Sequence, residues 1–440
     1  MKKVLILAYD FPPYVSVGGL RPFSWRKHMH EFGLYPIIVT RQWQNKHGNH
    51  LDYVSDGYSD KIEIEETETG TIIRTPYKSN LSNRLLLKYG GNKFKIVRKI
   101  ITAYYYFFQF LFFVGPKSRI YFAAKDYLQS NKVDVIIATG NPFVLFRYAS
   151  ILGKKHNIPW IADYRDGWSV KKNIKKNIIL YLWNSYFERK ISNTSIFITT
   201  PSQFTNSVIS NFLNNNNVHL ISNGYDCKIN PDEGTPSDDR EFLNIGYIGT
   251  IYEYHPFKQF LISINKQNYK IRLNLYGTNI NDTIKHILET EVPEIKDKIF
   301  FHNKISYDKL VSELNKNHVF LLFNDYYLPG TKIYDYLALK KNILFCFKND
   351  DNANTLMKKH FQYDVSTFET PYVQEEIINR TNSGYIIENQ KHLQDVLDKL
   401  YTELKNKGML DCKTNLTEDF SRKYQIEKLS KLIKTTLSHS

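Results

Sequence analysis

The chain has 440 residues, a length that predicts two or three domains of ordinary size. Hydrophobic residues make up 42% of it and charged residues 23%, which argues against an intrinsically disordered chain. No apolar run reaches the roughly 18 residues that a membrane-spanning helix needs. Cys227, Cys346 and Cys412 lack the spacing of a disulfide framework or a structural zinc site, and they fit a reducing cytoplasm.

The first half of the chain alternates short apolar runs with helical segments. Its N-terminus reads as a strand rather than a signal peptide, because no small-residue cleavage site follows the apolar run. This alternation predicts a parallel sheet with helices on both faces. The predicted strands are Val4–Ala8, Ile37–Thr40, Val135–Ala138, Trp160–Ala162 and Ile196–Thr199, with helices at Pro22–Phe32 and Val144–His156.

The second half repeats the same alternation after a linker. Residues Asn230–Asp239 are rich in Pro, Gly, Asp and Ser, which places the domain boundary near Asp226–Asp239. We predict domains at 1–225 and 226–415, followed by a basic helix within 416–440. The predicted strands are Leu243–Ile248, Ile271–Tyr276, Val319–Phe323 and Ile343–Phe347, with helices at Pro256–Lys266, Asp282–Glu289, Tyr307–Asn315 and Lys332–Leu339.

Basic charge is concentrated in the first half of the chain. The net charge is +15, yet residues 1–225 hold 30 Lys and Arg against 14 Asp and Glu, whereas the remainder holds 29 against 30. Between Arg74 and Lys132 there are 12 basic residues and one acid, Asp126. Such a field attracts polyanions, which include nucleic acid, anionic lipid headgroups and phosphorylated substrates.

An aromatic stretch of 15 residues, Ile100–Val114, lies inside this basic window. It is too short to span a bilayer. The stretch fits a helix lying in the membrane interface, and it fits equally a buried helix that carries aromatic rings into a core. The surrounding basic charge favours membrane contact.

The turn after the first strand contains Gly18 and Gly19 in front of a predicted helix. It matches neither the dinucleotide pattern GxGxxG nor a P-loop. Backbone N–H groups of such a turn can approach an anion at the positive end of a helix dipole. The alternative is a flexible loop whose glycines serve the turn geometry.

Asp163, Arg165 and Asp166 directly follow a predicted strand. Two acids and an arginine at the carboxyl end of a buried strand are costly unless they pair or bind a ligand. They predict either a group that contacts substrate or a structural cluster of ion pairs.

The strongest local signal is the segment Leu328–Leu337. A proline and Gly330 end the preceding loop, and Thr331 is a candidate N-cap of the next helix. Lys332 then lies in the first turn, where its ammonium and the free backbone N–H groups would bind a diphosphate. Asp335 shares its helix face and is placed to accept hydrogen bonds from a ribose. The alternative is an exposed Lys–Asp pair on a helix.

The sequence predicts neither a metal centre nor a covalent hydrolase. The 13 histidines show no HExxH or comparable ligand spacing. No GxSxG or Cys-His signature is present.

Taken in order, these pieces resemble a bacterial glycosyltransferase of family 4, whose members have the GT-B fold, and the resemblance covers nearly the whole chain. Each piece is weak alone, and their common order and spacing carry the resemblance. The matching segments are the first strand with its Gly-Gly loop (Val4–Arg21), the DxRDxW-like loop (Asp163–Trp168), the NG-aromatic-D turn (Asn223–Asp226), the strand-glycine opening of the second domain (Ile245–Thr250) and the pGxKxxEY-like helix start (Gly330–Tyr336).

The resemblance implies an α/β architecture of two Rossmann-like, doubly wound domains that face each other across a cleft. The N-terminal domain would take the acceptor, the C-terminal domain would take a nucleotide-diphosphate sugar, and the final helix would pack back on the first domain. It implies transfer with retention, without a bound metal and without a cofactor. Charge on the leaving diphosphate would then be met by basic side chains and helix N-termini.

The same resemblance implies a cellular setting. Acceptors in the bacterial branch are often lipid-linked sugars at the cytoplasmic face of the membrane, which agrees with the basic first half. We therefore expect a cytoplasmic, peripheral membrane enzyme of cell-surface polysaccharide synthesis, acting on a lipid-linked or oligosaccharide acceptor.

Two positions depart from the family pattern. The family has an arginine after the donor-domain glycine and a lysine a few residues on, where this chain has Thr250 and Lys258. Its paired glutamates become Tyr327 and Asp335. Diphosphate binding would then depend on Lys332 and backbone N–H groups, with help from an arginine across the cleft. The alternative is a weakened or lost donor site.

We predict that Lys332 holds the diphosphate, that Asp335 binds the ribose and that no side chain acts as a nucleophile. The predicted catalytic residues, two of them arginines available to the diphosphate, are Asp163, Arg165, Asp166 and Arg21. The predicted donor-binding residues are Gly18, Gly19, Gly249, Thr250, Lys258, Gly330, Thr331, Lys332 and Asp335.

Three other functions compete with this prediction. A sugar-nucleotide epimerase of the same two-domain fold would bind a nucleotide sugar without an acceptor, and it would leave the basic half unexplained. A polyanion-binding protein would use the charge alone, but the chain has no nucleic-acid recognition motif, so we expect no nucleic-acid partner. A non-catalytic scaffold is kept open by the departures at Thr250 and Tyr327.

Overall fold

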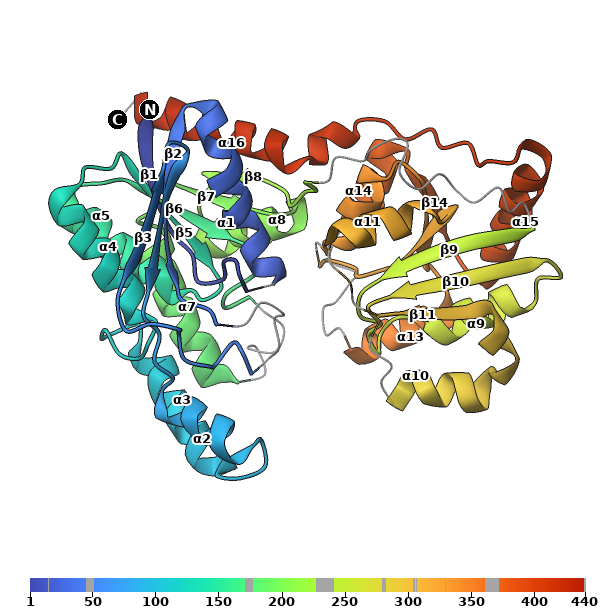
Figure 1. Cartoon of the computed structure of the whole chain (residues 1–440), viewed down its shortest axis with the longest axis horizontal. Coiled ribbons are helices and arrows are strands. Elements are labelled where there is room, and N and C mark those ends of the chain that lie inside the picture. The colour runs from blue at the N-terminus through green and yellow to red at the C-terminus, as the bar shows by residue number, and fades with distance from the viewer. Residues whose placement is uncertain are drawn as a thin grey trace. The chain divides into compact units, whose positions relative to one another are not determined.

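A computed structural model describes residues 1–14, 16–44, 51–170, 177–226, 241–278, 282–303, 305, 307–328, 330–360 and 372–438. The chain forms two compact units (Figure 1). Unit 1 comprises Met1–Ser222 together with Arg422–Ser440, and unit 2 comprises Asn223–Ser421. The predicted linker Asp226–Asp239 lies, apart from Asp226, outside the described residues.

Unit 1 is built on an eight-stranded sheet of order β3-β4-β2-β1-β5-β6-β7-β8. Its neighbours pair in parallel, except that β3 runs antiparallel to β4. The central strand β1 is a continuous apolar run because both of its faces are covered. The strands are β1 (Lys2–Leu7), β2 (Leu34–Arg41), β3 (Glu63–Thr67), β4 (Gly70–Thr75), β5 (Val135–Gly140), β6 (Trp160–Tyr164), β7 (Phe197–Thr200) and β8 (Val218–Leu220).

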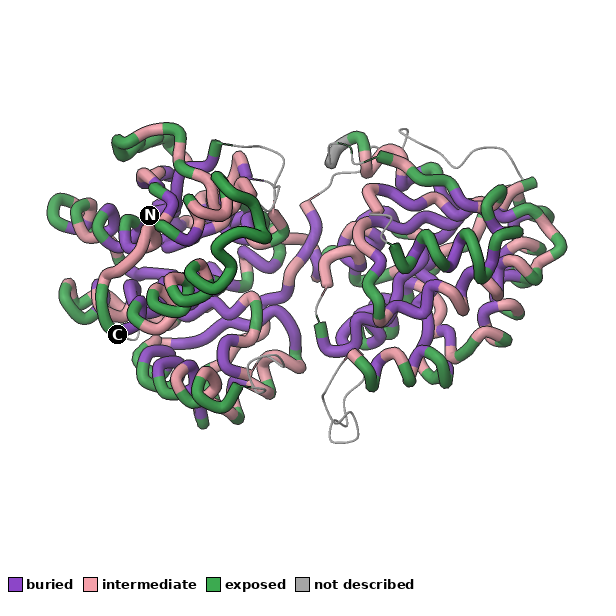
Figure 2. Tube along the Cα trace, turned by 90° about the horizontal axis from the view of Figure 1, so that it is seen from below, coloured by how far each residue is buried: buried purple, intermediate pink, exposed green. Residues whose placement is uncertain are grey.

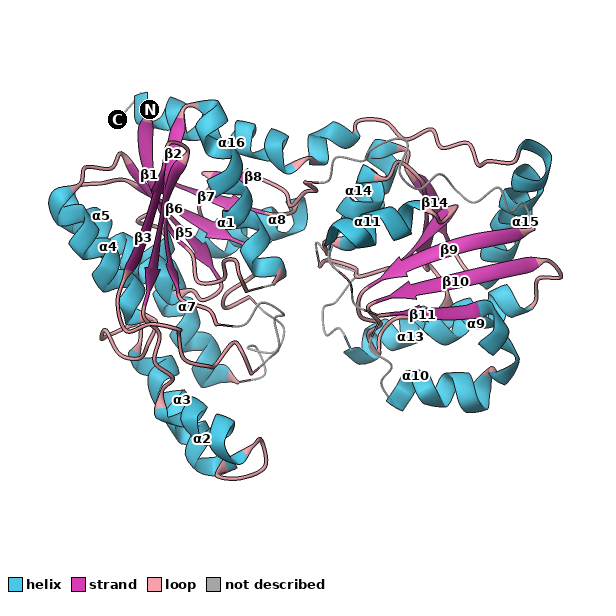
Figure 3. Ribbon diagram, viewed as in Figure 1, coloured by secondary structure: helices cyan, strands magenta, loops and turns pink. Residues whose placement is uncertain are grey.

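Helices cover both faces of this sheet (Figure 3). Residues of α1 and α16 share one core with Val4 and Ile6, whereas residues of α4, α5, α7 and α8 share the opposite core with Leu5 and Leu7. The helices of unit 1 are α1 (Val17–His28), η1 (Met29–Phe32), α2 (Leu81–Tyr89), α3 (Lys95–Phe108), α4 (Ser118–Ser130), α5 (Val144–His156), α7 (Ile178–Ser192), α8 (Gln203–Leu213) and α16 (Arg422–Ser438).

Unit 2 contains a parallel six-stranded sheet of order β11-β10-β9-β12-β13-β14. The strands are β9 (Phe242–Ile248), β10 (Lys270–Tyr276), β11 (Ile299–His302), β12 (Val319–Phe323), β13 (Asn342–Cys346) and β14 (Gly384–Ile387). The helices are α9 (Phe257–Asn265), α10 (Asp282–His286), η2 (Ile287–Glu291), η3 (Pro293–Lys298), α11 (Tyr307–Asn315), α12 (Lys332–Ala338), α13 (Asp351–His360), α14 (Val373–Thr381), α15 (Gln390–Lys407) and η5 (Thr417–Phe420).

The predicted fold class, two doubly wound parallel α/β sheets with a C-terminal helix, is confirmed. Two predicted helices have different starts. Helix α1 begins at Val17 rather than Pro22, because the Ser16 side chain accepts a hydrogen bond from the Gly19 N–H and caps it. The last helix begins at Arg422, and Phe420 instead belongs to unit 2, where its ring lies 6.0 Å from that of Tyr334.

The predicted aromatic helix Ile100–Val114 is not one element. Helix α3 starts at Lys95 and ends at Phe108, and the chain then turns so that Phe110 stacks on Trp168 and Phe187 in the core. The α2–α3 hairpin projects from unit 1 and is largely exposed along its length (Figure 2). Among the described residues no helix is both long and apolar enough to cross a membrane.

Candidate functional site

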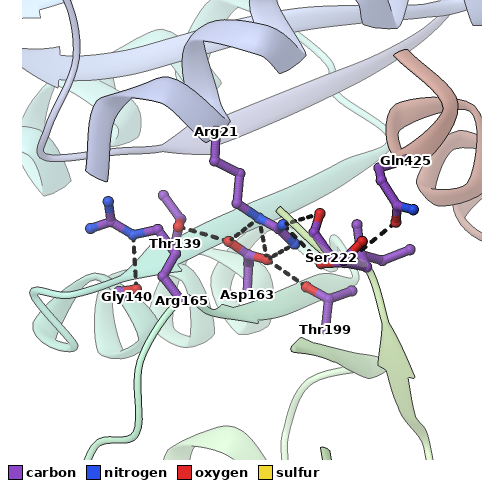
Figure 4. A network of polar contacts seen from close by, with 9 residues as sticks. Arg21, Thr139, Gly140, Asp163, Arg165, Thr199, Ser222 and Gln425 are labelled. Carbon is purple, nitrogen blue, oxygen red and sulfur yellow. Dashed lines mark hydrogen bonds and ion pairs between the residues drawn. The ribbon is translucent and has the colours of Figure 1, made fainter. Parts of the chain in front are cut away.

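In unit 1 the carboxyl ends of β5, β6 and β7 surround a buried ion pair between Arg21 and Asp163 (Figure 4). Arg21 comes from α1, and its Nε and Nη2 donate to the two carboxylate oxygens over 2.7 to 3.2 Å. Its Nη1 donates to the carbonyl oxygens of Ile221 and Ser222 at 2.9 and 3.2 Å. The guanidinium therefore ties α1 to β6 and to the segment that leaves β8.

The Asp163 carboxylate is fully buried and its oxygens are engaged by protein donors. Besides Arg21, the hydroxyls of Thr139 and Thr199 donate to it, each at 2.7 Å. A carboxylate in this state has no oxygen left to orient a substrate hydroxyl. The geometry therefore favours the structural ion-pair alternative for Asp163 and Arg21 over the catalytic role predicted for them.

Arg165 and Asp166 do not join this pair. Figure 4 shows Arg165 directed away from Asp163, with its Nε donating to the Gly140 carbonyl oxygen at 3.0 Å. Its Nη1 lies 3.9 Å from an oxygen of Asp10, in the turn after β1. Asp166 is exposed and next in the chain. The four predicted catalytic residues are thus split between a buried pair and a separate, more accessible group.

Gly18 lies between Arg165 and Asp10. A Cβ at this position would stand 2.2 Å from Arg165 Nη1 and 2.4 Å from Asp10 Oδ2, so the close approach of these two side chains requires a glycine. Gly19 is buried in the first turn of α1. Both glycines therefore serve the packing of the turn in which they lie.

Two charged residues that interact at this turn, Asp10 and Lys117, were not predicted from the sequence. Asp10 Oδ1 is buried without a hydrogen-bond partner in the described part of the chain, and burial raises the pKa of Asp10 against the opposing effect of Arg165. Burial lowers the pKa of Lys117 to about 8, while the charge of Asp10 works in the other direction. Their position could not be found from local sequence, because Lys117 is more than 100 residues away along the chain.

In unit 2 the carboxyl ends of β9 and β12 form the point where the strand order reverses, which is where doubly wound sheets bind ligands. Lys332, the first residue of α12, lies there. Its Nζ donates to the Tyr247 hydroxyl and to the Thr250 carbonyl oxygen, the latter at 3.0 Å. Within the described residues no carboxylate lies within ion-pair distance of this ammonium. Burial lowers the pKa of Lys332 to about 8, although the charge of Asp325 opposes the shift.

Asp325, just after β12, was also missed. His255 Nδ1 accepts the backbone N–H of Tyr252 at 3.2 Å, so the proton of this imidazole is on Nε2, which donates to Asp325 Oδ1 at 2.9 Å. Tyr254 and Gln374 also donate to the carboxylate, at 3.1 and 3.2 Å. Burial alone would raise the pKa of Asp325, but these donors and the charge of Lys332 hold it below its ordinary value.

Several predicted donor-binding residues gather around Lys332. Gly249 has a φ of +79°, a conformation that favours glycine, and it precedes Thr250. Gly330 has a φ of +47°, and a Cβ there would meet Gln374 and Asp325 at 3.2 and 3.4 Å. These two glycines allow the backbone to turn closely around the ammonium.

The remaining predicted donor-binding residues are placed differently. Thr331 occupies the N-cap position of α12, but its side chain makes no capping hydrogen bond within the described residues. Asp335 lies one turn after Lys332 and is half-buried. Lys258 forms an ion pair with Glu291 at the start of α9, so its charge already has a partner.

A pocket of about 490 Å³ lies at the ends of β10 and β11, next to α11. The Gly277 N–H donates to the His302 carbonyl oxygen at 3.0 Å, and Thr278 donates to the Gly249 carbonyl oxygen at 3.0 Å, so adjacent strand ends connect the pocket to Lys332. The pocket is lined by Tyr276, Phe301, His302, Asn303, Ile305, Lys309, Ser312 and Glu313.

No protein-family model and no curated protein sequence matches the chain. Solved structures do match it in fold. Sucrose-phosphate synthase from Thermosynechococcus elongatus covers 100% of both chains with a TM-score of 0.59 and 11% identity. TarM from S. aureus, in complex with fondaparinux, alpha-GlcNAc-glycerol and UDP, aligns over 98% of this chain and 100% of its own with a TM-score of 0.56 and 12% identity.

A third match is the catalytic domain of starch synthase IV from Arabidopsis thaliana, bound to ADP and acarbose. It covers 99% of both chains with a TM-score of 0.56 and 12% identity. At identities this low the likeness shows the fold alone. The chain therefore has the GT-B fold, as its sequence motifs predicted.

Proposed function

We propose that this protein is a glycosyltransferase that moves a sugar from a nucleotide-diphosphate sugar to a lipid-linked or oligosaccharide acceptor. Unit 2 binds the donor and unit 1 binds the acceptor. The transfer retains the anomeric configuration, and no metal takes part. The acceptor is presented at the inner face of the cell membrane, in the synthesis of a cell-surface glycan.

The observation that carries this proposal is the environment of Lys332. Its side chain is half-buried at the strand-order reversal of a doubly wound sheet, and its ammonium is held by a hydroxyl and a carbonyl oxygen rather than by a carboxylate. A partly buried cation without a carboxylate at ion-pair distance is unfavourable in the empty protein. A diphosphate would supply the missing negative charge, and it would raise the pKa of Lys332 toward its ordinary value.

Neighbouring groups supply the rest of a donor site. The adjacent pocket at the ends of β10 and β11 presents the exposed ring of Phe301, which suits a nucleobase. Asp325 is fixed by three side-chain donors beside Lys332, so its position does not change when a ligand enters. The similar folds include proteins bound to UDP and to ADP, which agrees with a nucleoside diphosphate here.

Thermal unfolding with UDP, GDP, CMP and dTDP tests the donor site. At about 100 times its dissociation constant, the correct nucleotide should stabilise the protein by roughly 2.7 kcal/mol, which is a rise of several degrees in Tm. Lys332→Ala should abolish this rise. The matched control is Lys405→Ala, an exposed lysine on α15 of the same unit, which should keep it.

The sugar-transfer step needs a separate assay. With the nucleotide sugar of the identified base, radiolabelled in the sugar and incubated with extracted membrane lipids, the label should move into the organic phase. An epimerised nucleotide sugar formed without any lipid would indicate an epimerase instead. The absence of any nucleotide-dependent rise in Tm would contradict the proposal and favour a scaffold.

A further inference from the structure

Helix α3 exposes an apolar face that nothing in the described structure covers. None of its 14 residues is buried. Ile96 is 76% exposed and Ile100 65%, and Tyr104 and Phe108 continue the same face at intervals of four residues. The rings of Tyr104 and Phe108 lie 4.9 Å apart, so the face is continuous. A monomer in water gains nothing from such a face.

The C-terminal end of α3 is attached to unit 1. Tyr106 donates to Asn184 of α7 at 2.9 Å, and the ring of Phe107 lies 5.5 Å from that of Trp183. Ser82 of α2 donates to the Arg98 carbonyl oxygen at 3.1 Å. The hairpin is therefore a rigid extension of the unit, and its outer face has a defined direction.

Helix α7, which these contacts place beside α3, adds a second exposed apolar face. Ile179 is 69% exposed, and Ile178, Leu182 and Tyr186 are exposed with it at helical spacing. Figure 1 shows the start of α7 and the α2–α3 hairpin on the same side of unit 1. We call these two exposed apolar faces, on neighbouring helices, the hairpin surface.

The charge on the α2–α3 hairpin itself has one sign. The segment from Leu81 to Phe108 contains six basic residues and no acid. Most of these cations are exposed, and each would contribute about fivefold to binding at an anionic lipid surface. The six are Arg84, Lys88, Lys93, Lys95, Arg98 and Lys99.

We propose that the hairpin surface docks unit 1 onto an anionic lipid bilayer, with α3 and the start of α7 lying in the interface. Ile96, Ile100 and Ile179 enter the acyl boundary, the rings of Tyr104 and Tyr186 lie at headgroup level, and the lysines contact phosphate groups. This deepens the proposed function and rests on it only for the lipid linkage of the acceptor.

The charge excludes the competing occupants on physical grounds. A second copy of the chain would bring the same six cations against each other without an acid to pair them, and like charges at an interface are costly. Nucleic acid would meet the cations, but it would leave the aliphatic side chains of Ile96, Ile100 and Ile179 exposed to water. Of these three occupants, the lipid surface matches both features.

Vesicle co-sedimentation of the full chain, without nucleotide, tests the proposal. Binding should rise steeply as phosphatidylglycerol replaces phosphatidylcholine from 0 to about 50%, and it should fall with added salt. Ile96→Ser with Ile100→Ser should weaken binding at least tenfold, since serine has nearly the helix propensity of isoleucine. Lys95→Glu with Lys99→Glu should weaken it further on the anionic vesicles only.

Matched variants in the same unit act as controls. Ile62→Ser with Ile64→Ser removes exposed apolar side chains near and on β3, and Lys154→Glu with Lys155→Glu reverses exposed charges on α5. Both should bind vesicles like the unchanged protein. Equal binding by the hairpin variants, no binding to anionic vesicles, or a dimer in solution that the Ile96 and Ile100 changes dissociate would each overturn the proposal.

A labelled cysteine gives a second readout that does not depend on affinity. An environment-sensitive dye on Ile100→Cys should brighten on anionic vesicles, and the same dye on Ile64→Cys should not. Equal responses at both positions would contradict the orientation. Because nucleotide binding is measured without vesicles, failure of membrane docking and failure of the donor site remain distinguishable.

Discussion

Two polar clusters in this molecule occupy equivalent places, and they differ in how many of their hydrogen-bonding groups and charges have partners within the protein. The Arg21–Asp163 pair lies at the carboxyl ends of the strands of unit 1, and Lys332 lies at those of unit 2. Asp163 receives hydrogen bonds from Arg21, Thr139 and Thr199, and the other Arg21 nitrogen is bound by carbonyl oxygens. Lys332 has only neutral partners within hydrogen-bond distance.

This difference distinguishes a structural cluster from a binding site. A buried ion pair with every donor and acceptor engaged stabilises the native arrangement and has nothing left for a ligand. A half-buried cation that has no carboxylate within ion-pair distance is available to an anionic ligand. Position at the carboxyl end of a sheet is therefore not enough to identify a binding site. The number of hydrogen-bond donors and acceptors that the protein leaves unused distinguishes a binding site from a structural cluster.

The largest expected effect is on stability in unit 1. Asp163→Ala should lower the free energy of unfolding by about 3 to 5 kcal/mol, because it leaves the Arg21 guanidinium buried without its anion. Urea denaturation followed by circular dichroism measures it. Asp166→Ala, an exposed neighbour, should stay within about 0.5 kcal/mol of the unchanged protein. A stable Asp163→Ala protein that fails only in acceptor binding would restore the catalytic role for Asp163.

The opposite pattern is expected in unit 2. Lys332→Ala should cost little stability in the empty protein, because the ammonium makes hydrogen bonds only to neutral oxygens, and it should abolish the stabilisation of roughly 2.7 kcal/mol that a bound nucleotide provides. Differential scanning fluorimetry with and without nucleotide measures both quantities. Unfolding of this variant in the absence of ligand would mean that Lys332 is a structural residue like Arg21.

The pH dependence of stability sharpens the same comparison. The pKa of Lys332 is lowered to about 8 in the folded protein and is near 10.4 in an unfolded chain. Between these values the unfolded chain binds more protons, so the free energy of unfolding rises with pH, by at most about 1.4 kcal/mol per pH unit.

Lys332→Met lacks this contribution. Its advantage in stability over the unchanged protein should be constant below pH 8 and should shrink as the pH rises toward 10. Other lysines with lowered pKa values are present in both proteins and cancel in the difference. Nucleotide binding should weaken over the same range as the ammonium loses its proton. A difference in stability that stays constant from pH 7 to 9.5 would show that Lys332 titrates normally.

The smallest expected effect concerns the turn after β1. Gly18→Ala should lower the free energy of unfolding by about 1 kcal/mol, because the added Cβ displaces the ends of Arg165 and Asp10. Gly91→Ala in the same unit is the control, since its Cβ would meet no atom within 4 Å. Equal stability of both variants would indicate that Arg165 is free to move in this turn.

The alternation of strands and helices could be predicted because buried parallel strands are short apolar runs. Strands β1, β5, β9 and β12 were predicted to within a few residues. Strand β3 has only exposed residues, and β4 follows after a tight turn, so neither was predicted. The early start of α1 depends on the Ser16 cap, in front of two glycines that are poor helix formers.

The candidate site was only partly predictable, because some of its residues lie in one local segment and others are far apart in the chain. Lys332 and Gly330 lie in one local segment, and the proline, glycine and helix signals around them were sufficient. Asp325 follows a predicted strand just as Asp163 does, and the same argument would have found it. His255 is 70 residues from Asp325 in the chain, and no local pattern joins them.

What the sequence by itself determined is the fold class, the position of the Lys332 segment and the excess of basic charge in the first half. The first two depend on local propensity and periodicity, which act over a few residues. The excess of charge depends on composition, which is a sum over residues. What only the tertiary structure decided is which polar groups are already satisfied and which apolar side chains stay exposed. Both depend on neighbours far away in the chain. Thr139 and Thr199 complete the hydrogen bonding of Asp163, and α7 packs against the C-terminal end of α3 while Ile96 and Ile100 stay exposed.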